Sequence, residues 1–247
     1  MVALKVISHE AHSEFRRTSG TRNEVADEVW YLRLITHAHV VSYIDVKLEG
    51  HATEIFMEYM AGGDLMHALV FHGALEHSIA CKLFVELTQG LQYLHENDIV
   101  HRDIKPENVL LSATPSMSSV AKFGDFGLAR SVMHGDYCRT LCGTFFYMAP
   151  ELTLPTWQYG YKSPNLLYGL EVDLWAFGIV WYCAFCGEQP CDDVYPKCAA
   201  IQLRKTGVFF MDFMVSLEIQ CIIEDLLSFS PHDRLTAFQL AARVLYL

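Results

Sequence analysis

The sequence predicts an α+β chain of two unequal parts, a small strand-bearing lobe over residues 1–60 and a larger, mainly helical lobe over 61–247. Before residue 60, most of the apolar residues fall in short runs, typical of strands. After Gly63 they recur at helical spacing over longer windows. A chain of 247 residues is also long enough to bury a full-sized core.

The first lobe is predicted to be strand, helix, strand, strand. The opening MVALKVI alternates, so that Ala3 and Lys5 share one face and the valines and Leu4 share the other. The run NEVADEVWYLRLI has apolar residues at helical spacing and predicts an amphipathic helix. VVSYIDV and ATEIFMEYM predict two further strands, and the glycines of AGGDL interrupt the last.

The second lobe is predicted to begin with a long helix in SIACKLFVELTQGLQYLHEND. Short strands follow at VLL and KFG, separated by the polar turn SATPSMSS. Helices are expected over most of 172–247. The apolar run LWAFGIVWYCAFC is shorter than the ~20 residues of a membrane-spanning helix, so we expect a buried core helix and no membrane partner.

Composition narrows the functional class. The formal charge is −11 and no basic cluster is present, so we expect no nucleic-acid partner, and an acidic face suits basic substrates. MVALKVISHE lacks the features of a secretory signal, which favours the cytosol or nucleus and reduced cysteines. The spacing of Cys183, Cys186, Cys191 and Cys198 loosely resembles a zinc site, but small apolar filler is the favoured interpretation because no histidine lies nearby.

Chemistry concentrates in the polar loop HRDIKPEN, residues 101–108. Asp103, Lys105 and Asn108 fall within it, and Asp125 follows 22 residues after Asp103. A hairpin of VLL with KFG would bring Asn108 and Asp125 to one end, giving the oxygen ligands that Mg²⁺ prefers when phosphate supplies the rest. Asp103 would remain free as a base. The alternative is that these residues merely solvate turns, the usual fate of a single Asp or Asn in a loop.

Four motifs in order resemble those of eukaryotic protein kinases: VALK, HRDIKPEN, DFG and APE. The resemblance implies a bilobal kinase fold whose N-lobe has one helix and lacks the first two strands, and it implies ATP and Mg²⁺ as cofactors. By position, it implies that Asp103 accepts the proton of the substrate hydroxyl and that Asn108 and Asp125 are the metal ligands.

The same resemblance assigns the remaining ATP-binding residues. Lys5 matches the lysine that holds the α- and β-phosphates, and its partner is Glu28 rather than Glu24, nine residues before the first histidine of HAHVV. Lys105 matches the lysine that serine/threonine kinases place beside the transferred phosphate. Adenine is expected between Ala3 and Leu110, near Met57, with hydrogen bonds to main-chain groups of Glu58 and Met60.

The segment RTLCGTFFYMAPEL is similar to the checkpoint-like branch of the calcium/calmodulin-dependent kinase group. This likeness implies that an upstream kinase phosphorylates Thr140, whose phosphate would pair with Arg102, and that Thr144 contacts the base. An ordinary exposed threonine is the alternative for Thr140. Asp64 and Glu107 match acids that read arginines upstream of the target hydroxyl. Asp173 matches the buried aspartate that holds the backbone of the catalytic loop, and Glu151 and Arg234 match a structural ion pair. His101 and Phe126 match residues of an internal spine.

The pattern breaks before Lys5. The 247 residues contain no G-x-G-x-x-G motif, whose backbone covers the phosphates in this family. We therefore expect a fragment of a longer kinase that transfers phosphate poorly alone, with an uncovered apolar face on its first strand. Two alternatives remain: a catalytically silent scaffold with the kinase fold, and a small-phosphate hydrolase, for which no water-activating feature is found.

Overall fold

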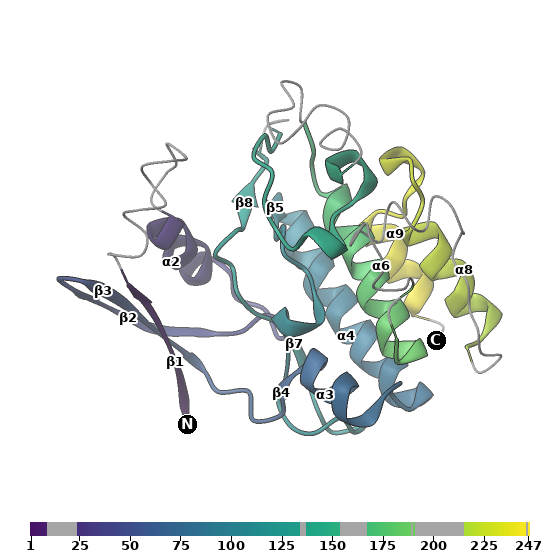
Figure 1. Ribbon diagram of the computed structural model, residues 1–247, viewed down its shortest axis with the longest axis horizontal. Helices are drawn as coiled ribbons and strands as arrows, with labels where there is room; N and C mark the ends of the chain where they lie inside the picture. Colours follow the sequence, from purple (N-terminus) through teal and green to yellow (C-terminus); the bar gives the residue numbers. More distant parts are fainter. Residues whose placement is uncertain (9–23, 134–136, 154–166, 189, 191–214, 246) are drawn as a thin grey trace.

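The computed structural model describes residues 1–8, 24–133, 137–153, 167–188, 190, 215–245 and 247. Within these residues, a three-stranded antiparallel sheet and a helix next to it lie beside a larger helical part (Figure 1). This arrangement confirms the predicted α+β class with a small sheet lobe and a helical lobe. In the described part, no helix is both long and apolar enough to cross a membrane.

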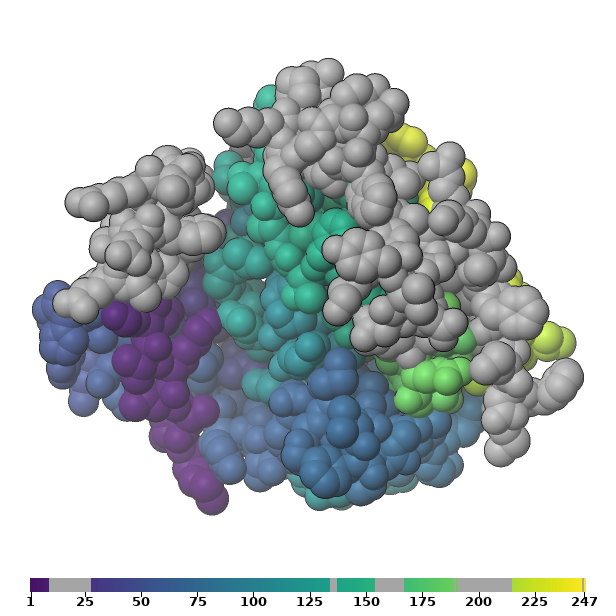
Figure 2. Space-filling model, in the orientation of Figure 1, coloured from purple at the N-terminus to yellow at the C-terminus, as the bar shows by residue number. Residues whose placement is uncertain are grey.

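The sheet has the order β1-β3-β2 and is formed by β1 (Val2–Ser8), β2 (Tyr43–Glu49) and β3 (Ala52–Glu58). Helix α2 (Glu24–Leu34) lies next to it (Figure 1). Ala3 and Lys5 are half-buried on one face of β1 and Ile7 is buried, as the alternation predicts. The other face exposes Val2, Leu4 and Val6 by 52%, 51% and 58%. Strand β1 therefore presents an apolar strip at the edge of the sheet, and Figure 2 shows this edge on the surface.

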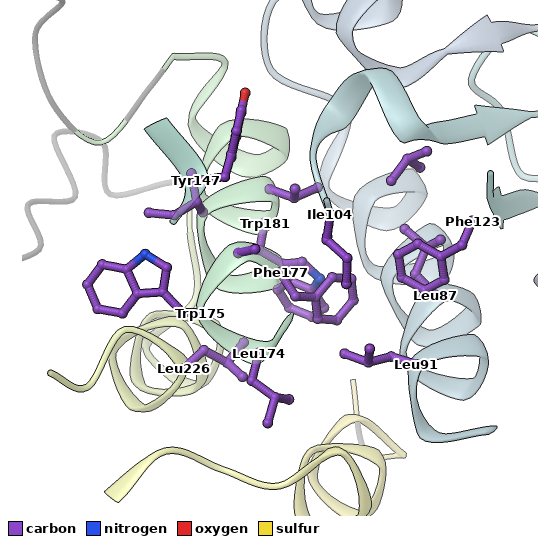
Figure 3. Packing of buried hydrophobic residues seen from close by; sticks show 14 of the residues in the cluster. Leu87, Leu91, Ile104, Phe123, Tyr147, Leu174, Trp175, Phe177, Trp181 and Leu226 are labelled. Carbon is purple, nitrogen blue, oxygen red and sulfur yellow. The ribbon is translucent and has the colours of Figure 1, made fainter. Parts of the chain in front are cut away.

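The helical part is built on α3 (Leu65–His72), α4 (His77–Glu96), α6 (Glu171–Cys186), α8 (Leu217–Leu226) and α9 (Ala237–Val244). Among the described residues, 3-10 turns accompany them at η1 (Pro106–Asn108), η3 (Phe145–Tyr147) and η4 (Pro231–Asp233). Helix α6 is buried on nearly all sides, since 14 of its 16 residues are buried, which explains why its sequence is almost entirely apolar after Asp173. Figure 3 shows its side chains gathered with those of α4, α8 and Ile104 in one core.

Short strands position the loops between the helices. Strand β6 (Val109–Leu111) lies between β4 (Gly63–Asp64) and β7 (Ala121–Phe123), and β5 (Ile99–Val100) pairs with β8 (Arg130–Ser131). The predicted VLL–KFG hairpin is present, with Val109 opposite Phe123. The pairs made by β4, β5 and β8 are too short to leave a periodic signal in the sequence.

One strand boundary was predicted wrongly. VVSYIDV was expected to form a single strand, but β2 begins only at Tyr43. Val40 forms a parallel bridge with Phe123, and the Val41 amide donates to the Phe123 carbonyl at 2.9 Å. These two valines are buried against β7, so their apolar character reflects contact with the helical part rather than membership of the sheet.

The cysteine cluster is described only in part. Cys183 is buried and Cys186 half-buried on α6, whereas Cys191 and Cys198 lie outside the described residues. Across the described ranges, no group of three or more His, Cys, Asp or Glu side chains is placed to hold a metal ion. The choice of apolar filler over zinc stays a prediction.

Candidate active site

The polar loop is held in shape by Asp173 in the first turn of α6. Its carboxylate accepts hydrogen bonds from the backbone amides of His101 at 2.7 Å and Arg102 at 2.9 Å, and it lies 3.1 Å from His95 Nε2. The backbone of Arg102 adopts a φ of +69°, a conformation that residues other than glycine rarely take. Because Asp173 is only 1% exposed, its bonds to the loop satisfy a buried charge and offset this strain.

Asp103 is the centre of the polar loop. Lys105 Nζ lies 2.7 Å from Asp103 Oδ2, and the Thr144 hydroxyl and amide donate to Oδ1 at 2.9 Å and 3.0 Å. Lys105 Nζ also donates to Thr144 Oγ1 at 2.9 Å. The structure therefore brings together the expected base, the expected phosphate-side lysine and the threonine expected to contact the base.

The β6–β7 hairpin brings Asn108 next to Asp125. The Gly124 amide donates to the Asn108 carbonyl at 2.9 Å, so Asp125 follows one residue after this contact. The Asn108 side-chain amide donates to the Asp103 carbonyl at 2.8 Å and to Oδ2 at 3.0 Å. Because its nitrogen is used in this way, its side-chain oxygen is left as a ligand atom. That oxygen and the half-exposed Asp125 carboxylate are hard donors, which fit Mg²⁺.

Lys5 connects the sheet part to Asp125, one of the two residues expected to bind Mg²⁺. Its Nζ donates to Glu28 Oε1 at 2.6 Å and to Asp125 Oδ1 at 2.7 Å. The glutamate selected from the sequence is therefore the one that contacts Lys5. Glu28 is buried on α2, with 3% of its surface exposed. Burial opposes the charge on Lys5, but the two carboxylates outweigh it and raise the lysine pKa. The same contact lowers the pKa of Asp125 against the opposing effect of its burial.

The residues expected around adenine lie on strands that meet near the hinge, residues 59–62. Ala3 is opposite Met57 in the β1–β3 register, and Leu110 is opposite Lys122 in the β6–β7 register. The Leu110 side chain lies so close to Gly124 that an added Cβ there would come within 3.0 Å of it. Met60 is buried at the hinge, 8% exposed. Their roles toward a nucleotide stay predictions.

Two supporting contacts expected from the sequence are present. Arg234 forms a bidentate pair with Glu151, at 2.6 Å and 2.7 Å, and its guanidinium lies 5.2 Å from the centre of the Trp175 ring. His101 and Phe126 are fully buried with ring centres 4.8 Å apart. The first contact ties the segment that carries Glu151 to the one that carries Arg234, and the second packs the first residue of the polar loop against Phe126, next to Asp125.

The expected substrate-reading acids and phosphosite differ in their surroundings. Asp64 Oδ1 accepts from the His67 amide at 2.7 Å and so caps the N-terminus of α3. Glu107 is exposed. Thr140 is also exposed, and its carbonyl accepts from the Tyr168 hydroxyl at 2.5 Å. Arg102 Nη1 lies 3.4 Å from the same hydroxyl, which places the arginine close to the segment that carries Thr140.

Sequence reasoning missed two residues that shape the site. Tyr168 joins the Thr140 segment to Arg102, and its backbone pairs with Cys138 in both directions. Lys122 donates two hydrogen bonds to the Glu58 carboxylate, at 2.7 Å and 2.9 Å. Tyr168 lies in the segment YGYKSPNLLYG, where no spacing distinguishes it, and Lys122 resembles any polar residue on a short strand.

Comparison with known proteins agrees with the geometry. The family model described as "Protein kinase domain" matches residues 1–245. Two relatives are from Dictyostelium discoideum. "Probable serine/threonine-protein kinase fhkE" is 33% identical over 238 residues, which are 95% of this chain and 32% of the relative. "Probable serine/threonine-protein kinase fhkC" is 32% identical over 240 residues, 96% of this chain and 38% of the relative. The chain thus spans about a third of the length of these relatives. This chain belongs to the protein kinase domain family.

Proposed function

We propose that this chain transfers the γ-phosphoryl group of ATP to serine or threonine hydroxyls of protein substrates. One observation carries the proposal, a continuous chain of contacts between the two parts. Lys5 from the sheet part contacts Asp125, and the β6–β7 hairpin places Asp125 next to Asn108. Asn108 in turn contacts Asp103, which also contacts Lys105. Phosphoryl transfer needs fixed cations and metal ligands around the phosphates and a positioned base, and this cluster contains each of them. The names of the two Dictyostelium relatives support the choice of serine and threonine.

Each residue has a separate task in this proposal. Asp103 accepts the proton of the substrate hydroxyl, and Lys105, 2.7 Å from it, stabilises negative charge on the transferred group. Asn108 and Asp125 hold Mg²⁺, while Lys5, kept in place by Glu28, holds the nucleotide phosphates. When bound with ATP, Mg²⁺ would neutralise part of the negative charge of the phosphates. Ala3, Leu110 and the main chain of Glu58 and Met60 enclose the adenine.

We propose further that the substrates carry basic residues before the target hydroxyl. The exposed carboxylate of Glu107 and the net charge of −11 support this preference. Asp64 uses Oδ1 to cap α3, and its other carboxylate oxygen would contact the substrate.

Thr140 is the proposed site for an upstream kinase, since it is exposed. The Tyr168 hydroxyl contacts both the Thr140 carbonyl and Arg102, which places the arginine near this segment. Because of the RTLCGT motif, we propose that the chain belongs to the checkpoint-like branch. Because MVALKVISHE lacks the features of a secretory signal, we propose that it acts in the cytosol or nucleus.

A second candidate is a scaffold with little activity, favoured by one observation. The 247 residues contain no glycine-rich hairpin to cover the phosphates and exclude water. We propose that this chain alone transfers phosphate slowly rather than not at all, because the charged residues of the site are intact.

Transfer of labelled γ-phosphate to a basic serine peptide tests the two candidates. The kinase proposal expects incorporation that needs Mg²⁺ and disappears in Asp103→Ala. Mg²⁺-ATP that raises the melting temperature without any transfer would favour the scaffold. A lack of both transfer and nucleotide binding would contradict the kinase proposal.

A further inference from the structure

A seam of hydrogen bonds joins the sheet part to the helical part behind the hinge. Its backbone portion pairs His39 and Val41 with Phe123, at 3.0 Å and 2.9 Å. The ring of His39 adds a contact of 3.1 Å from Nδ1 to the Ala121 carbonyl. These bonds fix one side of β7, the strand that leads directly to Asp125.

The side-chain portion of the seam is the pair of Glu58 and Lys122. Lys122 Nζ donates to both carboxylate oxygens of Glu58, at 2.7 Å and 2.9 Å. The Ser42 amide donates to Glu58 Oε1 at 2.6 Å, and the Glu58 amide donates back to the Ser42 carbonyl at 3.0 Å. The side chains of Lys122 and Glu58 are 14% and 28% exposed, so solvent screens this pair less than a surface pair.

The backbones of these two residues belong to opposite walls of the proposed nucleotide pocket. Lys122 is opposite Leu110 in the β6–β7 register, and Leu110 is the expected floor. Glu58 directly follows Met57, which is opposite Ala3, the expected ceiling. The pair therefore connects floor and ceiling by a side-chain bridge at the hinge, although neither side chain is expected to touch the nucleotide.

We propose that Glu58 and Lys122 form a positioning pair that sets the spacing between the ceiling and floor of the nucleotide pocket. The proposal rests on the kinase function proposed above. Without Lys122, the Glu58 carboxylate keeps its hydrogen bonds from Ser42, which belongs to the sheet part, but the side-chain bridge between the two walls is lost. The proton-accepting and metal-ligand residues keep their own partners, so the main effect falls on ATP binding rather than on the transfer step.

Lys122→Met tests the pair, with Lys82→Met as the matched control. Lys82 Nζ lies 2.6 Å from Glu86 Oε1 one turn along α4, with side chains 23% and 16% exposed, so its ion pair lies wholly within the helical part. Lys122→Met is expected to raise KM for ATP about tenfold while kcat changes less than about threefold. Lys82→Met is expected to leave KM for ATP unchanged. The double variant Glu58→Lys/Lys122→Glu should recover part of the lost affinity.

Equal KM values for the wild-type chain and Lys122→Met would overturn the proposal, as would equal increases in both lysine variants. Hydrogen exchange gives a readout that does not need activity. Lys122→Met should speed amide exchange across residues 39–42 and 58–63, whereas Lys82→Met should not. If the wild-type chain transfers no phosphate, the proposed function fails, and unaltered exchange in Lys122→Met would separately overturn the positioning pair.

Discussion

Lys5 and Asp125, which are 120 positions apart in the sequence, are joined by a hydrogen bond of 2.7 Å. The same ammonium group lies 2.6 Å from Glu28, so three distant segments meet at one charge. The two carboxylates raise the pKa of Lys5 despite its burial, which keeps the lysine charged over the physiological pH range. A charged, oriented ammonium next to the carboxylate proposed as a metal ligand suits phosphate binding.

Lys5→Met is expected to lower kcat/KM for phosphate transfer by roughly 10²-fold or more, because a fixed cation at the phosphates is removed. Lys47→Met is the matched control, since Lys47 is exposed on β2 and lies 5.1 Å from the centre of the Phe56 ring. Steady-state kinetics at saturating Mg²⁺ measure the effect. Comparable activity in the two variants would contradict the assigned role of Lys5.

Asp173→Ala is expected to lower the free energy of unfolding by about 3–5 kcal/mol, because the His101 and Arg102 amides lose a buried partner. Asp225→Ala is the control: its pair with Arg243 is 50% and 36% exposed and should contribute less than about 1 kcal/mol. Urea denaturation of both variants checks the difference. Similar losses would show that the loop does not depend on Asp173.

Arg234→Lys is expected to cost about 2–3 kcal/mol of stability, since a lysine cannot reproduce the bidentate pair with Glu151 or the contact with Trp175. The same exchange at Arg243, whose partner Asp225 is exposed, should cost under about 0.5 kcal/mol. Melting curves of the two variants provide the test. A stable Arg234→Lys protein would count against the buried pair as a structural support.

The depressed pKa of Asp125 predicts a pH dependence of stability. A carboxyl whose folded pKa lies below its ordinary value of 3.8 stabilises the fold above that pH and loses this contribution as the pH falls below it. The difference in unfolding free energy between the wild-type chain and Asp125→Asn should therefore shrink as pH falls below about 3.8. Denaturant titrations from pH 2 to 6 measure it. A difference that stays constant across this range would contradict the Lys5–Asp125 pair.

The sequence was most informative where a motif fixes residues at set spacings. The choice of Glu28 over Glu24 followed from its distance to HAHVV, and the β6–β7 hairpin followed from two apolar runs around a polar turn. The capping role of Asp64 was missed, because the sequence assigned this residue only to reading substrate arginines, although an acid directly before a helical apolar run is a typical N-cap. These features depend on local order along the chain.

Long-range side-chain pairs could not be predicted in this way. Glu58 and Lys122 are 64 positions apart, and each looks like an ordinary solvated residue on a strand. Val40 and Val41 look like the start of a strand, but Val40 forms an isolated parallel bridge with Phe123 of β7, and the Val41 amide donates to the carbonyl of the same residue. Such contacts depend on how the sheet part packs against the helical part, which hydrophobic periodicity does not encode.

The central claim is that one cluster around Asp103 transfers phosphate from ATP. Incorporation of labelled γ-phosphate into a basic serine peptide should be measured for the wild-type chain and for Asp103→Asn, with and without Mg²⁺. The account predicts Mg²⁺-dependent incorporation in the wild-type chain and a loss of about 10²-fold or more in Asp103→Asn. Incorporation that is equal in the two proteins, or absent from a wild-type chain that is folded and binds Mg²⁺-ATP, would contradict it.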